Sequence, residues 1–304
     1  MTGSPRLYES RDPRFRNLIH PNARLQQIGS GFEWAEGPVW FPAFETLLFS
    51  DIPARRMMRW TAGTGCSIFR TDSDYSNGNT RDPLGRLVTC HHGARCLRRT
   101  EHDGRITVLA SEHDGRRLNS PNDVVVRRDG SIWFTDPTYG ILSDLEGYRA
   151  TPEQKGSYVY RLPADGGAPV AVITDMTQPN GLCFSPDERL LYVAESGSSH
   201  DAEVPAVIRV HEVSADASSV GPGRDFALIE TGLPDGIRSD AAGNIWSSAG
   251  DGVHVFAPDG TLLGKILVPE VVSNLCFGGP RGNRLFMTAT SSLYQIAVDA
   301  CAPA

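Results

Sequence analysis

The feature of this sequence that most constrains its fold is an arrangement that recurs six times along the chain. In each copy a short polar step containing Asn, Asp or Glu precedes an apolar stretch, and a second apolar stretch follows after a turn. The key polar residues of the six copies are Glu36, Asn77, Asn122, Asn180, Asp235 and Asn274. Their spacing ranges from 39 residues (235 to 274) to 58 residues (122 to 180). Repeats of this length indicate an architecture built from equivalent supersecondary units.

Each unit has the pattern of a small antiparallel sheet. One or two further strand-like runs follow the two apolar stretches, as in residues 156–174 and 252–268, and Gly and Pro lie between the runs. Four short strands per unit, repeated six times, predict an all-β, six-bladed β-propeller. We expect a single domain over residues 1–304, with residues 1–23 as an N-terminal extension and with helix limited to a turn or two.

The last unit ends after its third strand, in the run that begins at Ser291, and therefore lacks an outer strand. The N-terminal run around Leu25–Ile28 precedes the first unit and can supply it. This pairing would join both chain ends in one blade and cover the strand edges that an open ring would expose. We therefore predict that an N-terminal strand closes the last blade.

The innermost strands of a propeller run along its central channel, so the six key residues are predicted to form a ring at one mouth. A single Asn before a strand is most often a turn former. Two carboxylates and four amides at equivalent positions indicate more, since crowded like charges repel unless a cation lies between them. Oxygen ligands of this kind suit hard divalent ions. Calcium is the expected ion, with Mg²⁺, Mn²⁺ and Zn²⁺ as alternatives.

Four motifs carry a resemblance to a known family: EGPVW from Glu36, PNDVVV from Pro121, PNGLCFSPD from Pro179 and PDGIRSDAAGNIW from Pro234. From about residue 24 onward the chain resembles the gluconolactonase, senescence-marker-protein and luciferin-regenerating-enzyme family of six-bladed propellers. The resemblance implies a divalent metal held by Glu36, Asn180 and Asp235, with Asn122 as a further ligand or substrate contact. It also implies that Asp235 is the catalytic base, and it leaves Asn77 outside the ligand set.

One position departs from part of that family. Its animal gluconolactonases carry Arg two residues before the equivalent of Asn122, where this chain has Ser120. The sugar contacts of those enzymes therefore do not transfer, and the sequence is more similar to the bacterial and fungal gluconolactonases.

A second tier of polar residues lies where the second strand of a unit ends, and it is predicted to surround the ring. Its members are Asp51, His91, His92, Asp136 and Glu195. We predict substrate contacts from Asn122, His92, Asp136, Glu195 and Tyr139. The alternatives are a structural hydrogen bond for His92, turn capping for Asp136, and simple packing for Tyr139 and Trp34, which could otherwise stack on a sugar ring. The two long connections, residues 137–156 and 196–206, are expected to form a lid.

Composition excludes several other classes of function. The chain carries 29 Lys and Arg against 36 Asp and Glu, a formal charge of −7, which argues against nucleic acid or an acidic membrane surface as partner. No apolar run approaches the roughly 18 residues of a membrane span, and the start lacks the apolar core of a signal peptide, so a cytoplasmic protein is expected. The six cysteines form no CxxC pair, and neither a cysteine zinc site nor disulfides are expected.

The expected function is hydrolysis of a small-molecule sugar lactone, with glucono-1,5-lactone as the first candidate. In this hypothesis the metal polarises the ring carbonyl while Asp235 activates water, and no organic cofactor takes part. Two alternatives remain open. A similar metal ring could hydrolyse phosphotriesters or other esters, and a propeller can serve as a binding platform alone.

Overall fold

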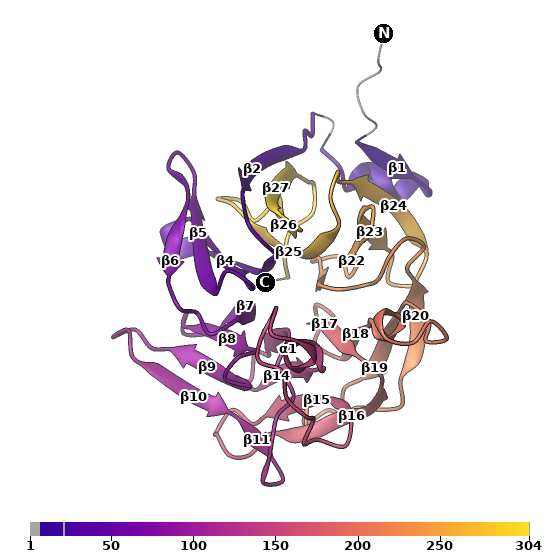
Figure 1. The fold of residues 1–304 in the computed structure, drawn as a ribbon. Helices are drawn as coiled ribbons and strands as arrows, with labels where there is room; N and C mark the ends of the chain where they lie inside the picture. Colours follow the sequence, from indigo (N-terminus) through magenta and orange to yellow (C-terminus); the bar gives the residue numbers. More distant parts are fainter. Residues whose placement is uncertain (1–6, 21, 304) are drawn as a thin grey trace.

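The computed structural model describes residues 7–20 and 22–303, in which six antiparallel sheets surround a central channel (Figure 1). The sheets comprise, in chain order and from the innermost strand outward, β3 to β6, β7 to β10, β13 to β16, β17 to β20, β21 to β24 and β25 to β27. The predicted all-β, six-bladed propeller is therefore confirmed.

The strands of the first three blades are β3 (Ala35–Phe41), β4 (Thr46–Asp51), β5 (Arg56–Thr61), β6 (Gly65–Arg70), β7 (Ser76–Arg81), β8 (Leu87–His91), β9 (Cys96–Thr100), β10 (Ile106–Ala110), β13 (Val124–Val126), β14 (Ile132–Asp136), β15 (Ser157–Leu162) and β16 (Val170–Met176). Those of the other three are β17 (Pro179–Phe184), β18 (Leu190–Glu195), β19 (Val207–Glu212), β20 (Arg224–Leu228), β21 (Ile237–Ser239), β22 (Ile245–Ala249), β23 (Gly252–Phe256), β24 (Leu262–Leu267), β25 (Val272–Gly278), β26 (Arg284–Ala289) and β27 (Ser292–Ala297). A hairpin of β11 (Glu112–His113) and β12 (Arg116–Arg117) follows the second blade.

Helix is limited to four segments of three to five residues among the described residues, slightly more than the turn or two expected. They are η1 (Pro13–Asn17), η2 (Pro42–Phe44), α1 (Tyr139–Leu142) and η3 (Gly197–Ser199). In the part of the chain that is described, none of them has the length and apolar character needed to cross a membrane.

The last blade is closed as predicted. Strand β2 (Gln26–Ser30) pairs antiparallel with β27, with Gln26 opposite Gln295 and Ser30 opposite Ser292. This pairing gives β27 a partner on its outer edge, so the edge that the third strand of the last unit would expose is covered.

The chain ahead of β2 also contributes to the propeller, which the sequence did not predict. Strand β1 (Tyr8–Ser10) pairs with β24 and adds a fifth strand to the fifth blade, and the side chain of Phe15 in η1 is fully buried. Of the predicted extension over residues 1–23, residues 1–6 and 21 lie outside the described part.

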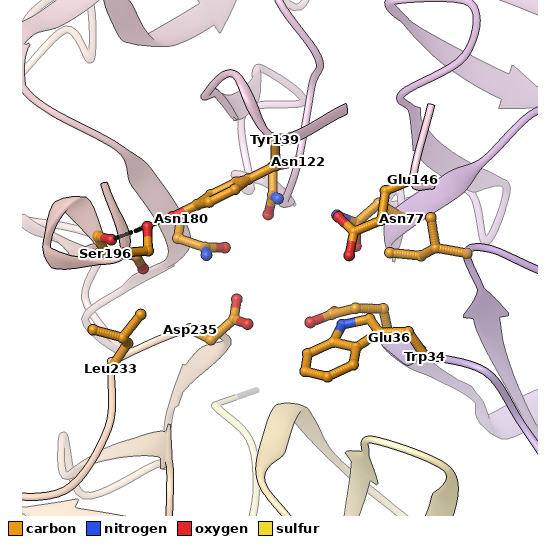
Figure 2. A pocket seen from close by; sticks show the side chains of 12 residues that line it. Trp34, Glu36, Asn77, Asn122, Tyr139, Glu146, Asn180, Ser196, Leu233 and Asp235 are labelled. Carbon is orange, nitrogen blue, oxygen red and sulfur yellow. Dashed lines mark hydrogen bonds between the residues drawn. The ribbon is translucent and has the colours of Figure 1, made fainter. Parts of the chain in front are cut away.

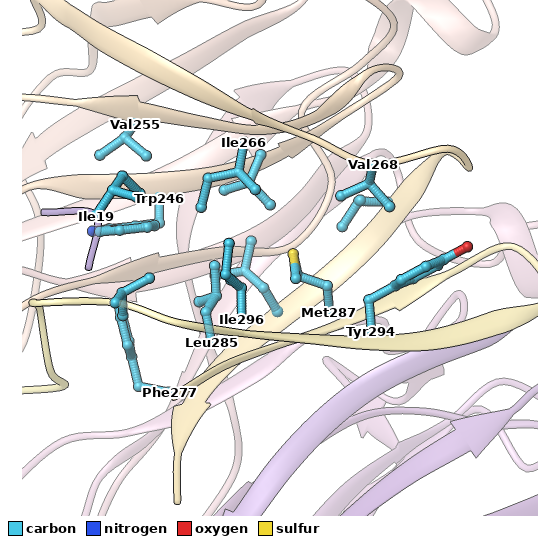
Figure 3. Packing of buried hydrophobic residues seen from close by; sticks show 14 of the residues in the cluster. Ile19, Trp246, Val255, Ile266, Val268, Phe277, Leu285, Met287, Tyr294 and Ile296 are labelled. Carbon is cyan, nitrogen blue, oxygen red and sulfur yellow. The ribbon is translucent and has the colours of Figure 1, made fainter. Parts of the chain in front are cut away.

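The core lies between neighbouring blades, where side chains from facing sheets interdigitate. Figure 3 shows the contact between the fifth and sixth blades, where Trp246 and Phe277 meet edge to face at 5.4 Å and Ile266 and Met287 fill the adjoining space. Because both faces of a blade are covered in this way, many strands are apolar along most of their length rather than alternating. These cores hold the inner strands, and therefore the channel mouth, in place.

Candidate functional site

A cavity of about 160 Å³ opens at one mouth of the channel. Five of the six predicted ring residues line it: Glu36, Asn77, Asn122, Asn180 and Asp235. Figure 2 shows the carboxylates of Glu36 and Asp235 pointing toward one another across this space. The inner strands of five different blades therefore bring these side chains together, as the repeat pattern predicted.

A local irregularity in strand pairing occurs at four of the ring positions. Four ring residues lie at the second or third position of their inner strands rather than before them. In each of these strands the pairing register with the second strand shifts next to the ring residue. The shift lies between Glu36 and Val39 in β3, for example, and between Pro179 and Leu182 in β17. A bulge of this kind leaves one residue unpaired and redirects its side chain.

Glycine follows four of the ring residues, because the neighbouring blade comes very close there. A Cβ at Gly181 would lie 2.1 Å from the carbonyl oxygen of Asp235, and one at Gly78 would lie 2.4 Å from that of Asn122. The same two glycines donate their N–H groups to those carbonyl oxygens, at 3.0 and 2.8 Å. Backbone hydrogen bonds thus link ring positions of successive blades, and a side chain at the glycine would separate them.

The sixth ring residue, Asn274, does not line the cavity. Its Nδ2 donates to Glu36 Oε2 at 3.0 Å, and its Oδ1 accepts from the backbone N–H of Leu275 at 2.8 Å. The N–H of Gly37 donates to the same oxygen of Glu36 at 2.5 Å. Asn274 therefore orients the carboxylate of Glu36 instead of presenting an oxygen to the channel.

The pKa values of the two ring carboxylates are both raised. Burial, opposed by hydrogen bonds from Gly37 and Asn274, raises the pKa of Glu36 to about 8. Burial, followed by the negative charge of Glu36, raises the pKa of Asp235 well above its usual range. Within the described residues neither carboxylate forms an ion pair with a Lys, Arg or His side chain. The arrangement favours a cation between them.

A buried ion pair links two blades of the propeller. Arg238 in β21 donates from Nη1 to Asp123 Oδ2 at 3.0 Å, and both side chains are largely buried. This ion pair joins the fifth blade to the third across the channel. The sequence did not predict this ion pair, since only the closed ring places positions 115 residues apart in contact.

The residues present fit a hard divalent cation. Two amide oxygens, Asn77 Oδ1 and Asn180 Oδ1, are buried and have no hydrogen-bond partner among the described residues. The Asn180 side chain also hydrogen-bonds to Asp235, so its second polar atom is held beside the carboxylate. Carboxylate and amide oxygens are the donor set that Ca²⁺ and Mg²⁺ prefer. No three His, Cys, Asp or Glu side chains gather as a metal cluster in residues 7–20 and 22–303, so amide oxygens would complete the ligand set.

The second tier of polar residues supports the ring from outside the cavity. The Asp51 carboxylate accepts the N–H groups of Glu33 and Trp34 at 2.9 and 3.1 Å. Glu195 accepts those of residues 177 and 178 at 2.8 and 2.9 Å, and Asp136 accepts that of residue 119 at 2.7 Å. In these three blades the carboxylate at the end of the second strand therefore caps the segment that leads into the inner strand.

The structure places three of the five predicted substrate contacts outside the cavity lining. Asp136 and Glu195 do not line the cavity, and each accepts backbone N–H groups of the segment ahead of its inner strand. His92 does not line it either, since its Nε2 lies 3.1 Å from Asn77 Nδ2 and its Nδ1 lies 3.0 Å from the carbonyl oxygen of Glu146. Of the five predicted contacts, Asn122 and Tyr139 line the cavity.

Both long connections reach the cavity, as the lid hypothesis requires. Residues 137–156 contribute Tyr139 and Glu146, and residues 196–206 contribute Ser196 and Ser199. The Tyr139 hydroxyl lies 3.0 Å from Ser199 Oγ, so the two connections contact each other over the mouth. Ser120 holds the first of them, because its Oγ donates to the carbonyl of residue 137 and accepts the N–H of residue 140.

Glu146 is a site residue that the sequence analysis missed. Its carboxylate faces the cavity from the first connection (Figure 2), and burial raises its pKa. It follows no strand and belongs to no repeat, so the pattern that identified the ring carried no signal for it. Its approach to Glu36 and Asp235 adds further negative charge to the cavity.

Comparison with known proteins places this geometry in context. Residues 34–291 match the SMP-30/Gluconolactonase/LRE-like region. A gluconolactonase from Zymomonas mobilis is 33% identical over 93% of this chain and 84% of its own length, and a pentonolactonase from Haloferax volcanii is 31% identical over 83% and 80%. The structure of a gluconolactonase from Xanthomonas campestris superposes with a TM-score of 0.90 at 37% identity, covering 96% of this chain and 95% of that one.

Proposed function

Because the chain belongs to the SMP-30/gluconolactonase/LRE-like family, we propose that it is a lactonase whose substrate is a sugar lactone. Glucono-1,5-lactone is the first candidate, since gluconolactonases are among its relatives along nearly the whole chain. A pentonolactonase is also similar, so five-carbon sugar lactones come next. The opposed carboxylates of Glu36 and Asp235 at the channel mouth are the observation that carries the proposal.

A divalent cation is the proposed cofactor, with Ca²⁺ as the first candidate. Glu36, Asn180 and Asp235 would hold it, and Asn122 would be a further ligand or a substrate contact. When bound, such an ion supplies the positive charge that polarises a lactone carbonyl and stabilises the oxyanion that develops on it. The raised pKa values of both carboxylates and the unpartnered oxygen of Asn180 support this assignment.

The protein's own groups provide the remaining chemistry of the proposed reaction. Asp235 is proposed to accept the proton of the attacking water, and the hydrogen bond from Asn180 holds its carboxylate in place. Tyr139 and Glu146 both line the cavity, where they can bond substrate hydroxyl groups. Trp34 and Leu233 give the wall an apolar part that limits access of bulk water.

The test combines metal analysis of the purified protein with a pH-indicator assay of lactone hydrolysis. The panel contains glucono-1,5-lactone, a pentonolactone, a simple aryl ester and a phosphotriester. We expect stoichiometric divalent metal, hydrolysis of the lactones, and loss of activity on chelation that the returned metal restores. Preferential turnover of the ester or the phosphotriester would instead assign the site to one of those substrate classes.

Asp235→Asn tests the proposed base, because it keeps the size and one ligand oxygen but removes the basic oxygen. Activity should fall by roughly 10²–10⁴-fold, with weaker metal binding. Asp165→Asn is the matched control, since Asp165 is exposed in the turn after β15, at the face opposite the cavity. Full activity of metal-free protein, or of Asp235→Asn at saturating Ca²⁺, Mg²⁺ and Mn²⁺, would contradict the proposal.

A further inference from the structure

His92 connects the ring to the lid. Its side chain is fully buried, directly after β8, and both ring nitrogens have partners. Nδ1 lies 3.0 Å from the backbone carbonyl oxygen of Glu146, and Nε2 lies 3.1 Å from Asn77 Nδ2. The same loop packs on the imidazole at a second point, because a Cβ at Gly140 would lie 2.5 Å from His92 Cβ and Cγ.

The partners of His92 fix its tautomer. A carbonyl oxygen can only accept, so the Glu146 carbonyl requires the proton on Nδ1. A buried imidazole with no carboxylate against it is favoured in the neutral form, so Nε2 carries a lone pair and must face a donor. The donor is the amide N–H of Asn77.

This assignment fixes the orientation of the Asn77 amide in turn. Because Nδ2 of Asn77 points at His92, Oδ1 points the other way. This oxygen is buried and has no hydrogen-bond partner among the described residues. Asn77 is 3% exposed, lines the cavity, and occupies the second blade's place between Glu36 and Asn122 in the ring. An unpartnered acceptor in such a position is costly unless a cation or a donor faces it.

We infer that Asn77 Oδ1 is a further oxygen of the cation site, directly or through a water that the ion holds, and that His92 is its positioning residue. Through the Glu146 carbonyl, the same imidazole also holds the loop that carries the Glu146 carboxylate over the cavity. The His92 side chain therefore sets both the position of this loop and the orientation of the Asn77 amide. This inference rests on the proposed function and extends it to a residue outside the ligand set that the family resemblance implies.

Two substitutions separate the roles of His92. The Asn side chain reaches about as far as Nδ1, so His92→Asn can keep the bond to the Glu146 carbonyl while it loses the acceptor for Asn77. The Gln side chain reaches about as far as Nε2, so His92→Gln can keep the Asn77 contact while it releases the loop. Asn77→Ala and Asn77→Ser remove the oxygen itself.

The primary measurement is calorimetric Ca²⁺ and Mn²⁺ affinity of the metal-free protein without substrate. Asn77→Ala, Asn77→Ser and His92→Asn should each weaken it by about 10-fold, and the Asn77→Ala, His92→Asn double variant by no more than the worse single variant. His92→Gln should stay within about two-fold in affinity while its KM for the lactone rises several-fold at similar kcat. His254→Gln is the control, because His254 is equally buried but lies in β23 away from the cavity. It should lower thermal stability without changing cation affinity.

The outcomes that would overturn the inference are distinct. Unchanged cation affinity in Asn77→Ala would show that the Asn77 oxygen is not part of the site. Equal losses in His92→Asn and His92→Gln would show that His92 does not act by orienting the Asn77 amide. The two Asn77 variants keep the test decisive if a His92 variant does not fold. Wild-type protein that hydrolyses lactones but binds no divalent cation would overturn this inference together with the metal part of the proposed function, while lactonase activity itself would stand.

Discussion

The close approach at Gly181 allows a prediction whose size can be worked from the structure. An alanine Cβ at this position would lie 2.1 Å from the Asp235 carbonyl oxygen and 2.8 Å from the Gly236 Cα. Both atoms are backbone, and Cβ contacts under 3.0 Å are essentially not found, so Asp235 must recede by about 0.9 Å, from 2.1 to 3.0 Å. Gly181 has no positive φ, so the substitution tests close approach alone.

Two quantities should change in Gly181→Ala. Forcing a methyl group into a filled space costs about 1–3 kcal/mol of unfolding free energy, which urea denaturation measures. A displacement of about 1 Å at a catalytic group reduces turnover by about 10²-fold, because the reacting groups are no longer aligned. We therefore expect kcat for the lactone to fall about 100-fold at saturating metal.

Gly221→Ala is the matched control. A Cβ at Gly221 meets only Glu212 atoms at 3.8 Å, an ordinary van der Waals contact, and its φ is not left-handed either. Its stability and activity should stay near those of the wild type. If Gly181→Ala kept full kcat and an unchanged urea midpoint, the claim that blade spacing at this point positions Asp235 would be refuted.

Three further predictions concern closure, the lid and pH. Deleting residues 1–30 removes β2, β1 and the buried Phe15, so the product should be insoluble or strongly destabilised in thermal unfolding, and a soluble, fully stable product would contradict the closure role. Shortening residues 196–206 should change KM and lactone preference more than melting temperature, whereas the reverse would make this connection structural packing. Burial raises the pKa of Asp136 from 3.8 to about 7, so its stabilising contribution is complete below about pH 4 and is lost as pH rises through about 7. The stability of wild type relative to Asp136→Asn in urea should therefore decrease between pH 5 and pH 8, and a constant difference would mean that Asp136 is ionised throughout.

The blades and the ring could be predicted from sequence because both repeat. A pattern present six times identifies equivalent positions even where one copy, such as Asn122 before the short strand β13, would be unremarkable alone. Closure of the last blade by an N-terminal strand could be predicted because the last unit has no further strand after β27. Four ring residues lie inside their inner strands rather than before them, next to bulges, and three of these four still line the cavity.

The second tier shows why position alone does not reveal a side chain's task. Asp51, Asp136 and Glu195 lie beside the ring in sequence pattern and in space, yet each accepts backbone N–H groups of its own blade. Whether a carboxylate turns toward the channel or toward such a segment depends on hydrogen bonds that form only after the blade is built. Glu146 is the converse case, since it reaches the cavity from an irregular loop outside the repeated sequence pattern.

The four amides of the ring illustrate how equivalent residues acquire different roles. Asn77 directs its Nδ2 to His92, and Asn180 hydrogen-bonds to Asp235, so each keeps an unpartnered oxygen at the cavity. Asn274 directs its Nδ2 to Glu36, but its oxygen accepts from the backbone of Leu275. Because the donor end is taken in all three, the presence or absence of a backbone N–H at the acceptor end decides whether an oxygen remains for the channel. The partners of each amide, more than its place in the repeat, therefore determine which ring positions can contribute to a cation site.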